Sequence, residues 1–215
     1  PLAESDAGVA RISSGRPGIY AARDNANLDP ATYHIVGAHQ AFFWKDLEPS
    51  EGGYNWTPLD NFIASRAAKG KPIGIGIMTY LGRGAGSAAV QVPDWLYANY
   101  PSTKVPCTYS GSTVNIPKYW DTTYLTKYGN FITALANHLK ANPSLMQHVE
   151  FIYIGVGKDG ETYPCDKYGT PDDRPCLRSA GLTSAIWSDT VKAITDKYRI
   201  AFQGTGKKVM LLAWP

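Results

Sequence analysis

The chain alternates between short apolar segments, as found in buried strands, and longer segments with helical periodicity. The apolar segments predict strands over residues 17–23, 33–44, 71–80, 149–157 and 207–215. The periodic segments predict helices over residues 57–71, 120–143 and 183–203. Thr57 is expected to cap the first helix, with Pro58 at its first helical position. Residues 81–118, rich in Gly, Ser, Pro and aromatic residues, are expected to form a long loop.

Strands separated by amphipathic helices favour parallel βα units. The segments that follow strands are long and those that precede strands are short, which is typical of a (β/α) barrel. A doubly wound open sheet would usually carry a glycine-rich nucleotide fingerprint after its first strand, and residues 23–33 contain no glycine. We therefore predict an α/β fold, a (β/α) TIM-type barrel, as a single domain over residues 1–215.

The length of the chain modifies this prediction. A complete eight-stranded barrel takes ~250 residues, whereas the 215 residues here yield five predicted strands. We therefore expect the first five strands only, in a domain that is incomplete at its C-terminus. A partial barrel would leave two unpaired sheet edges. A fragment of a longer protein, a second chain after a proteolytic nick, or a partner that completes the barrel would each account for this.

Composition excludes several classes of partner. The formal net charge is +3 with scattered basic residues, which argues against nucleic-acid binding. No apolar segment approaches the ~20 residues of a membrane span. The segment 80–88, YLGRGAGSA, lacks both the Lys-Ser/Thr ending of a phosphate-binding loop and the G-x-G-x-x-G spacing, so no nucleotide cofactor is expected.

The cysteines suggest an oxidising compartment. Cys165 and Cys176 bracket a polar loop whose length suits a disulfide, and we expect that pairing, with Cys107 left over. Their spacing does not fit zinc ligation, so no metal is expected. The chain begins at Pro1 without a signal-like segment, which fits a processed protein, and Asn55 starts a formal glycosylation sequon. Together these features favour a secreted or extracellular protein.

The segment 149–164, VEFIYIGVGKDGETYP, carries the main candidate for catalysis. An apolar strand ends in glycines and is followed by Glu161. In glycosidic cleavage, one carboxylic acid protonates the leaving oxygen while a second carboxylate attacks the anomeric carbon or activates water. Such an acid needs a raised pKa, and half-burial at a strand end among aromatic residues would provide it. The alternative is an exposed loop glutamate, and Asp159 is expected to be a turn residue.

A second motif carries a family resemblance. Residues 44–71 contain Trp44, Leu47-Glu48-Pro49, Gly52, Tyr54, Trp56, Leu59-Asp60 and Gly70-Lys71. This pattern resembles the strand-2 region of retaining (β/α)8 glycoside hydrolases, best shown by the family-42 β-galactosidases. The resemblance implies a mainly architectural role for these residues, so Glu48 and Glu51 are expected to be structural.

The resemblance also implies an acid/base at the end of the fourth strand, where Glu161 lies. In that clan an asparagine usually precedes the catalytic glutamate, whereas Gly160 precedes it here. The segment GVGKDGETYP is instead similar to the G.G..GE..YP pattern of β-amylases, whose glutamate acts as general acid. The nucleophile of the clan comes from the seventh strand, which this chain does not reach. Within the chain, possible helper carboxylates are Asp24, Asp94 and Asp121, none of which matches a nucleophile motif.

Aromatic residues near strand ends are candidates for sugar binding, because aromatic rings stack on the apolar faces of pyranose rings. Four fall at or just after predicted strand C-termini: Trp44, Tyr80, Tyr163 and Trp214. His39 lies within the second predicted strand and is expected to be a satisfied core histidine. The chain is therefore predicted to be a glycoside hydrolase acting on a β-linked saccharide. The alternative is a non-catalytic carbohydrate-binding or extracellular structural protein on a partial barrel.

Overall fold

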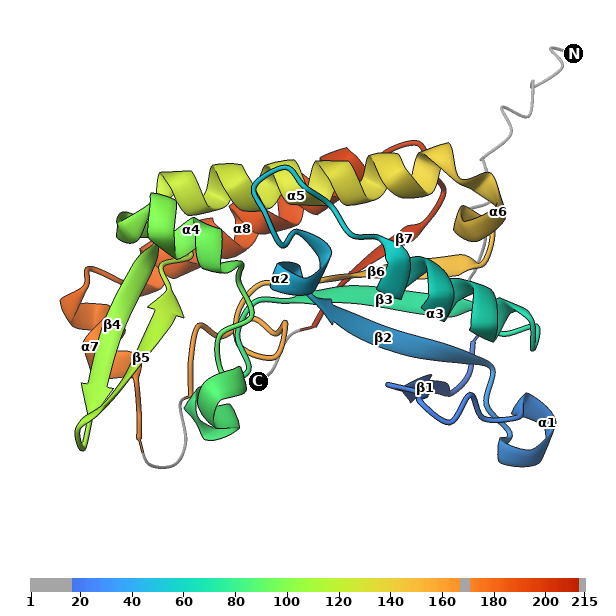
Figure 1. Cartoon of the computed structure of the whole chain (residues 1–215), viewed down its shortest axis with the longest axis horizontal. Helices are drawn as coiled ribbons and strands as arrows, with labels where there is room; N and C mark the ends of the chain where they lie inside the picture. The colour runs from blue at the N-terminus through green and yellow to red at the C-terminus, as the bar shows by residue number, and fades with distance from the viewer. Residues whose placement is uncertain (1–16, 167–170, 213–215) are drawn as a thin grey trace, which may run out of the picture.

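The computed structural model describes residues 17–166 and 171–212, and Figure 1 shows their arrangement. Five strands form one sheet in the order β1-β2-β3-β6-β7, and every pair in it is parallel. These strands are β1 (Tyr20–Ala22), β2 (Gly37–Phe43), β3 (Ile73–Met78), β6 (Val149–Ile154) and β7 (Lys208–Leu211). Each lies inside one of the five predicted strand segments. The parallel order confirms the α/β fold and the partial (β/α) barrel expected from the sequence.

Three long helices cover one face of this sheet (Figure 1). They are α3 (Thr57–Ala67), α5 (Thr122–Ala141) and α8 (Ser184–Ala201), in the three predicted positions. Asp121 caps α5 by accepting hydrogen bonds from the backbone N–H groups of Thr123 and Tyr124. The expected cap of α3 is wrong by one position: Trp56 is the N-cap and Thr57 is the first helical residue. The remaining α-helices are short: α1 (Pro30–Tyr33), α2 (Trp44–Leu47), α4 (Asp94–Asn99), α6 (Pro143–Met146) and α7 (Arg174–Ser179).

The segment between β3 and α5 is more ordered than expected. It contains the 3-10 helices η1 (Arg83–Ala88) and η2 (Pro101–Thr103) as well as α4. Its second half is an antiparallel hairpin of β4 (Lys104–Tyr109) and β5 (Ser112–Pro117). Ser110 and Gly111, which join the two strands, both have positive φ, as two-residue hairpin turns require. The expectation of a plain loop over residues 81–118 is therefore wrong.

The two faces of the sheet differ in composition. On β3, Ile75 and Ile77 point toward the helices and are buried. Gly74 and Gly76 alternate with them and so lie on the opposite face, which we call the inner face. A Cβ atom at Gly74 would lie 2.0 Å from the ring of Phe151, and one at Gly76 would lie 2.5 Å from the ring of Tyr153. Aromatic rings from β6 therefore lie across β3, where only glycine leaves space for them.

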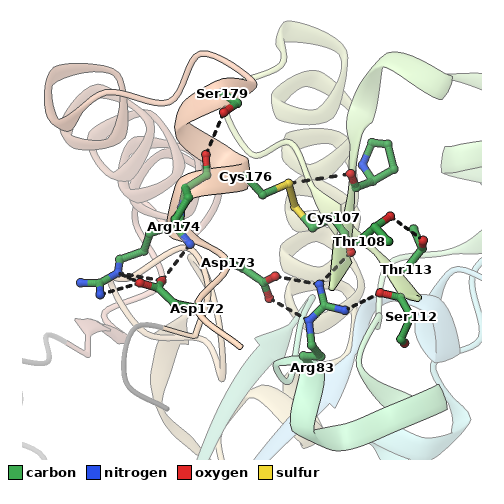
Figure 2. The surroundings of a disulfide bond; sticks show 12 residues. Arg83, Cys107, Thr108, Ser112, Thr113, Asp172, Asp173, Arg174, Cys176 and Ser179 are labelled. Atoms are coloured by element: carbon green, nitrogen blue, oxygen red, sulfur yellow. Dashed lines mark hydrogen bonds and ion pairs between the residues drawn. A yellow bond between two sulfur atoms is a disulfide. The ribbon is translucent and has the colours of Figure 1, made fainter. Parts of the chain in front are cut away.

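The disulfide joins Cys107 to Cys176, with a Cα–Cα distance of 5.8 Å, and Cys165 is free and buried. The predicted Cys165–Cys176 pairing is wrong. The hairpin carries Cys107 on β4 to the start of α7, where Cys176 faces it (Figure 2). This partner is 69 residues away in sequence, so the spacing of neighbouring cysteines could not indicate it.

Candidate active site

The end of β6 is held from the helix layer by two buried tyrosines. The carbonyl of Gly155 accepts a hydrogen bond from the hydroxyl of Tyr128 at 2.8 Å. The N–H of the same glycine donates to the hydroxyl of Tyr198 at 3.2 Å, and the two hydroxyls are 2.8 Å apart. A side chain at Gly155 would come within 1.9 Å of the carbonyl oxygen of Ile77. The chain therefore leaves β6 along a single fixed path close to the end of β3.

A tight turn follows, over residues 158–161. The N–H of Glu161 donates to the carbonyl of Lys158 at 2.9 Å. The central residues Asp159 and Gly160 have φ values of 53° and 78°, which are the signs of a type I′ turn. The N–H of Asp159 also donates to the carbonyl of Tyr80 at 2.8 Å, which attaches the turn to the segment after β3. The expectation that Asp159 is a turn residue is confirmed.

Glu161 lies directly after this turn, at the C-terminal end of the fourth strand of the sheet, and it is half-buried. Its Oε2 atom is buried and has no hydrogen-bond partner among the described residues. The charge of Glu161 affects the pKa of two tyrosines. The pKa of Tyr153 is raised mainly by burial and further by the charge of Glu161. The pKa of Tyr163 is likewise raised mainly by burial, with a further contribution from Glu161. The carboxylate therefore lies near two tyrosines and is half-buried, so it is not an exposed loop glutamate.

Lys158 adds a positive charge to the same turn. It forms ion pairs with Asp159 and, at 3.6 Å, with Asp166, and its Nζ lies 5.7 Å from the ring centroid of Tyr163. Burial opposes the charged form, but the hydrogen bond and charge of Asp159 outweigh it, so the pKa of Lys158 is raised. Lys158 thus stabilises the turn through its ion pairs and places a positive charge near the ring of Tyr163.

Two of the four aromatic residues predicted to bind sugar are placed elsewhere. Trp44 and Tyr80 are both 0% exposed, so neither can present a ring face to a ligand, and those two predictions are wrong. The Trp44 ring is enclosed by a cluster of aromatic side chains from α4 and α5: Trp95, Tyr124, Tyr128 and Phe131. Tyr163 is half-buried beside Glu161. Trp214 lies outside the described residues.

The two glutamates expected to be structural do have structural contacts. Glu48 is 4% exposed and accepts hydrogen bonds from the indole N–H of Trp44 at 2.7 Å and the backbone N–H of Gly52 at 2.9 Å. Burial raises the pKa of its carboxyl group. Glu51 lies on the surface and pairs with Lys127 at 2.6 Å.

The other candidate carboxylates also serve the fold. Asp24 is buried in an ion pair with Lys71 and accepts the N–H of Leu28 at 2.8 Å. Asp121 caps α5, and Asp94 is exposed in the first turn of α4. Within residues 17–166 and 171–212, no cluster of three or more His, Cys, Asp or Glu side chains could hold a metal ion.

His39 lies on the inner face, in a row that runs Ala22, His39, Gly74, Phe151 across four strands. Its ring stacks on Phe151 with centroids 6.0 Å apart and meets Tyr153 edge-on at 5.5 Å. Its Nε2 atom is buried with no partner in the described part of the chain, so the expected satisfied core histidine is wrong. Burial lowers its pKa. His39 lies on the inner face because of the strand register, which the sequence alone does not determine.

A parallel sheet in chain order, with helices on one face and a carboxylate after its fourth strand, is the arrangement found in (β/α)-barrel enzymes, whose active sites lie at the C-terminal ends of the strands. The family model Glyco_hydro_42, described as β-galactosidase, matches residues 30–150, more than half of the chain. The chain belongs to this family. The matched segment includes the Trp44–Glu48 motif and ends before Glu161. No curated protein matches the sequence.

Solved structures share the fold. The catalytic domain of β-amylase from Paenibacillus polymyxa is 11% identical, with a TM-score of 0.65, over 85% of this chain and 60% of that one. The exo-β-1,4-mannosidase Op5Man5 from Opitutaceae bacterium strain TAV5 is 16% identical, with a TM-score of 0.53, over 83% and 26%. GH5_18 from Bifidobacterium longum is 12% identical, with a TM-score of 0.52, over 88% and 37%. The chain therefore spans less than two thirds of each of these proteins.

None of the helices in the described ranges is long and apolar enough to cross a membrane.

Proposed function

We propose that this chain is part of a glycoside hydrolase that cleaves a β-linked saccharide, with Glu161 as its general acid/base. One observation carries the proposal: Glu161 follows the fourth parallel strand, and its Oε2 atom is buried without a partner among the described residues. Buried polar atoms without a hydrogen bond are uncommon in folded proteins and are often functional. The non-catalytic alternative is not favoured, since the matching family and the similar structures are hydrolases.

The chemistry requires a proton donor beside the glycosidic oxygen. Protonated Glu161 gives its proton to the leaving oxygen as the bond to the anomeric carbon breaks. The resulting carboxylate then accepts a proton from the water molecule that completes hydrolysis. Glu161 is half-buried, and its charge contributes to raising the pKa of Tyr153 and Tyr163, so both tyrosines lie near this carboxyl group. Tyr163 is also the described aromatic residue best placed to contact the sugar.

We further propose that the second carboxylate comes from strands outside this chain. β1 and β7 are the two edges of the sheet, and no long helix in the described ranges covers the inner face (Figure 1). Additional strands, on a continuation of the chain or on a second chain, would pair with these edges and close the inner face into a barrel. Activity is then expected only of the completed barrel.

The test is to replace Glu161 by Gln in the complete protein and to measure kcat/KM on a β-linked oligosaccharide and on an aryl glycoside with a good leaving group. The value of kcat/KM on the oligosaccharide should fall about 10²- to 10⁴-fold, because its leaving group needs a proton. The value on the aryl glycoside should fall less. Glu51→Gln is the matched control, since Glu51 is a surface glutamate paired with Lys127. Wild-type hydrolysis of the oligosaccharide by Glu161→Gln would disprove the role of Glu161.

We also propose that the protein is exported. A disulfide between Cys107 and Cys176 is stable mainly in oxidising compartments, and Asn55 of the glycosylation sequon is exposed. The natural material should therefore be found outside the cell with Cys107 and Cys176 joined, as non-reducing peptide mapping would detect. Recovery of the protein in the cytoplasm with three free thiols would contradict export.

A further inference from the structure

A pocket of about 740 Å³ lies beside the Glu161 turn, within the size range of small-molecule sites. Its walls come from three segments that are distant in sequence. They are residues 162–165 directly after Glu161, α7 with the residues that follow it, and the first turn of α8. The proposed acid and this pocket therefore share one loop.

One wall of the pocket is aromatic and fixed in position. The indole N–H of Trp187 donates a hydrogen bond to the carbonyl of Thr162 at 2.9 Å, and its ring meets Tyr119 edge-on at 5.5 Å. Tyr163 also lines the pocket, with Lys158 near its ring. Rigid aromatic side chains bury the apolar faces of sugar rings with little loss of conformational entropy. The wall is therefore suited to a pyranose ring.

The charged residues in the lining are all of one sign. Arg174 and Arg178 line the pocket, and none of the described lining residues is an aspartate or glutamate. Arg174 is held by Asp172, whose Oδ2 atom lies 2.7 Å from its Nη2 (Figure 2). Arg178 is exposed and has no ion-pair partner within residues 17–166 and 171–212.

The described carboxylates near the pocket already have cation partners. Asp172 pairs with Arg174, which lowers the pKa of Asp172 most, and the charge of Arg178 adds a smaller contribution. Asp173 binds Arg83, with Oδ1 and Nη2 2.7 Å apart. Asp166 accepts the backbone N–H of Arg83 at 2.8 Å and lies 3.6 Å from Lys158. The guanidinium of Arg178, which forms no ion pair within the described residues, is a donor whose planar geometry matches a carboxylate.

We propose that this pocket binds an acidic sugar unit of the substrate, a β-linked uronate. The pyranose ring lies against Trp187 and Tyr163, and the carboxylate pairs with Arg178. Thr162 and Ser184, which also line the pocket, have hydroxyl groups that hydrogen-bond the sugar hydroxyls. This inference rests on the proposed function, because the pocket is taken to hold part of the saccharide that Glu161 cleaves.

The test measures binding by calorimetry in the complete protein carrying Glu161→Gln, so that the ligand is not consumed. The probes are a β-linked disaccharide containing glucuronic acid and its methyl ester, which has the same shape without the charge. The acid should bind about tenfold more tightly than the ester, as expected for one charge-assisted contact. Adding Arg178→Gln should remove that tenfold preference. Adding Arg199→Gln, which alters an exposed arginine near the end of α8, should keep it.

Equal binding of acid and ester, or a preference that survives Arg178→Gln, would overturn the inference. Neither result bears on Glu161, because the proposed function is tested separately by hydrolysis of the β-linked oligosaccharide and the aryl glycoside. Conversely, selective binding of the acid by a protein whose hydrolysis is unaffected by Glu161→Gln would support the pocket and overturn the catalytic role.

Discussion

The indole N–H of Trp44 donates a hydrogen bond to Oε2 of Glu48 over 2.7 Å, and both side chains are buried. The other carboxylate oxygen of Glu48 accepts the backbone N–H of Gly52, so each oxygen has a donor. Trp44 begins α2 directly after β2, and this pair therefore fixes how the chain leaves the strand. The residues that carry the family resemblance therefore stabilise the fold, and the proposed active site lies in later segments of the chain.

Replacing Glu48 by Gln should lower the free energy of unfolding by about 1–3 kcal/mol, because the amide nitrogen would face one of the two N–H donors. Urea unfolding monitored by tryptophan fluorescence measures this change. Glu51→Gln, at the exposed neighbouring glutamate, should change stability by less than about 1 kcal/mol. Equal effects of the two substitutions would show that Glu48 is not a structural acceptor.

His39 should make stability depend on pH. Burial lowers the pKa of its ring below the ordinary 6.5, so the unfolded chain takes up a proton more readily than the folded one. Its contribution is therefore complete above about pH 6.5 and is lost as the pH falls toward the lowered pKa. His39→Phe, which retains a ring against Phe151, should show a shallower loss of stability between pH 7 and 5. Parallel curves for the two proteins would contradict this.

Gly76→Ala should destabilise the protein by about 1–3 kcal/mol, because the new methyl group overpacks the ring of Tyr153. Hydrolysis should fall as well, since the Tyr153 ring lies 3.0 Å from the position that a Cβ atom would take at Gly160, in the turn before Glu161. Gly84→Ala is the matched control, because no atom lies within 4 Å of its added Cβ. Thermal unfolding and initial rates measure both effects, and indistinguishable results for the two variants would rule out the packing argument.

Cys107→Ser should lower stability by about 4 kcal/mol, because the disulfide closes a loop with a sequence separation of 69. Reduction of the wild-type protein should have a similar effect. Unfolding in urea under oxidising and reducing conditions tests this, and Cys165→Ala should remain sensitive to reduction.

Cys165 should resist alkylation in the folded protein. Burial raises the pKa of its thiol to about 12, and the thiolate is the reactive form. Mass spectrometry after iodoacetamide treatment at pH 8 should show an unmodified Cys165 until denaturant is added. Rapid labelling of the native protein would mean that this thiol is accessible.

The strands and long helices could be predicted because their signals are local. The spacing of Tyr124, Tyr128 and Phe131 indicates a buried helix face without reference to the rest of the chain. The position of Glu161 at the end of the fourth strand is confirmed for the same reason, since an apolar run ending in glycine marks a strand end. Its catalytic role stays a prediction.

The failed predictions about the aromatic residues, the disulfide and His39 depend on contacts between distant segments. A position at a strand end does not reveal whether other elements cover the side chain, so it cannot show that Trp44 and Tyr80 are buried. The partner of Cys176 lies in a hairpin whose turn signal, Ser110-Gly111, is weak on its own. The orientation of His39 depends on strand register, which is set by pairing with its neighbours.

In many barrels the loop that follows each strand can lengthen or change without affecting the next one. Here the segments after β3 and β6 are joined by the Cys107–Cys176 bond and by Arg83, which binds Asp173 and the carbonyl of Cys107 (Figure 2). The two segments therefore form one covalently linked unit at the rim. An insertion or a grafted sequence in either of them would have to preserve the geometry of the other, so the loops that surround Glu161 can be exchanged only as a pair.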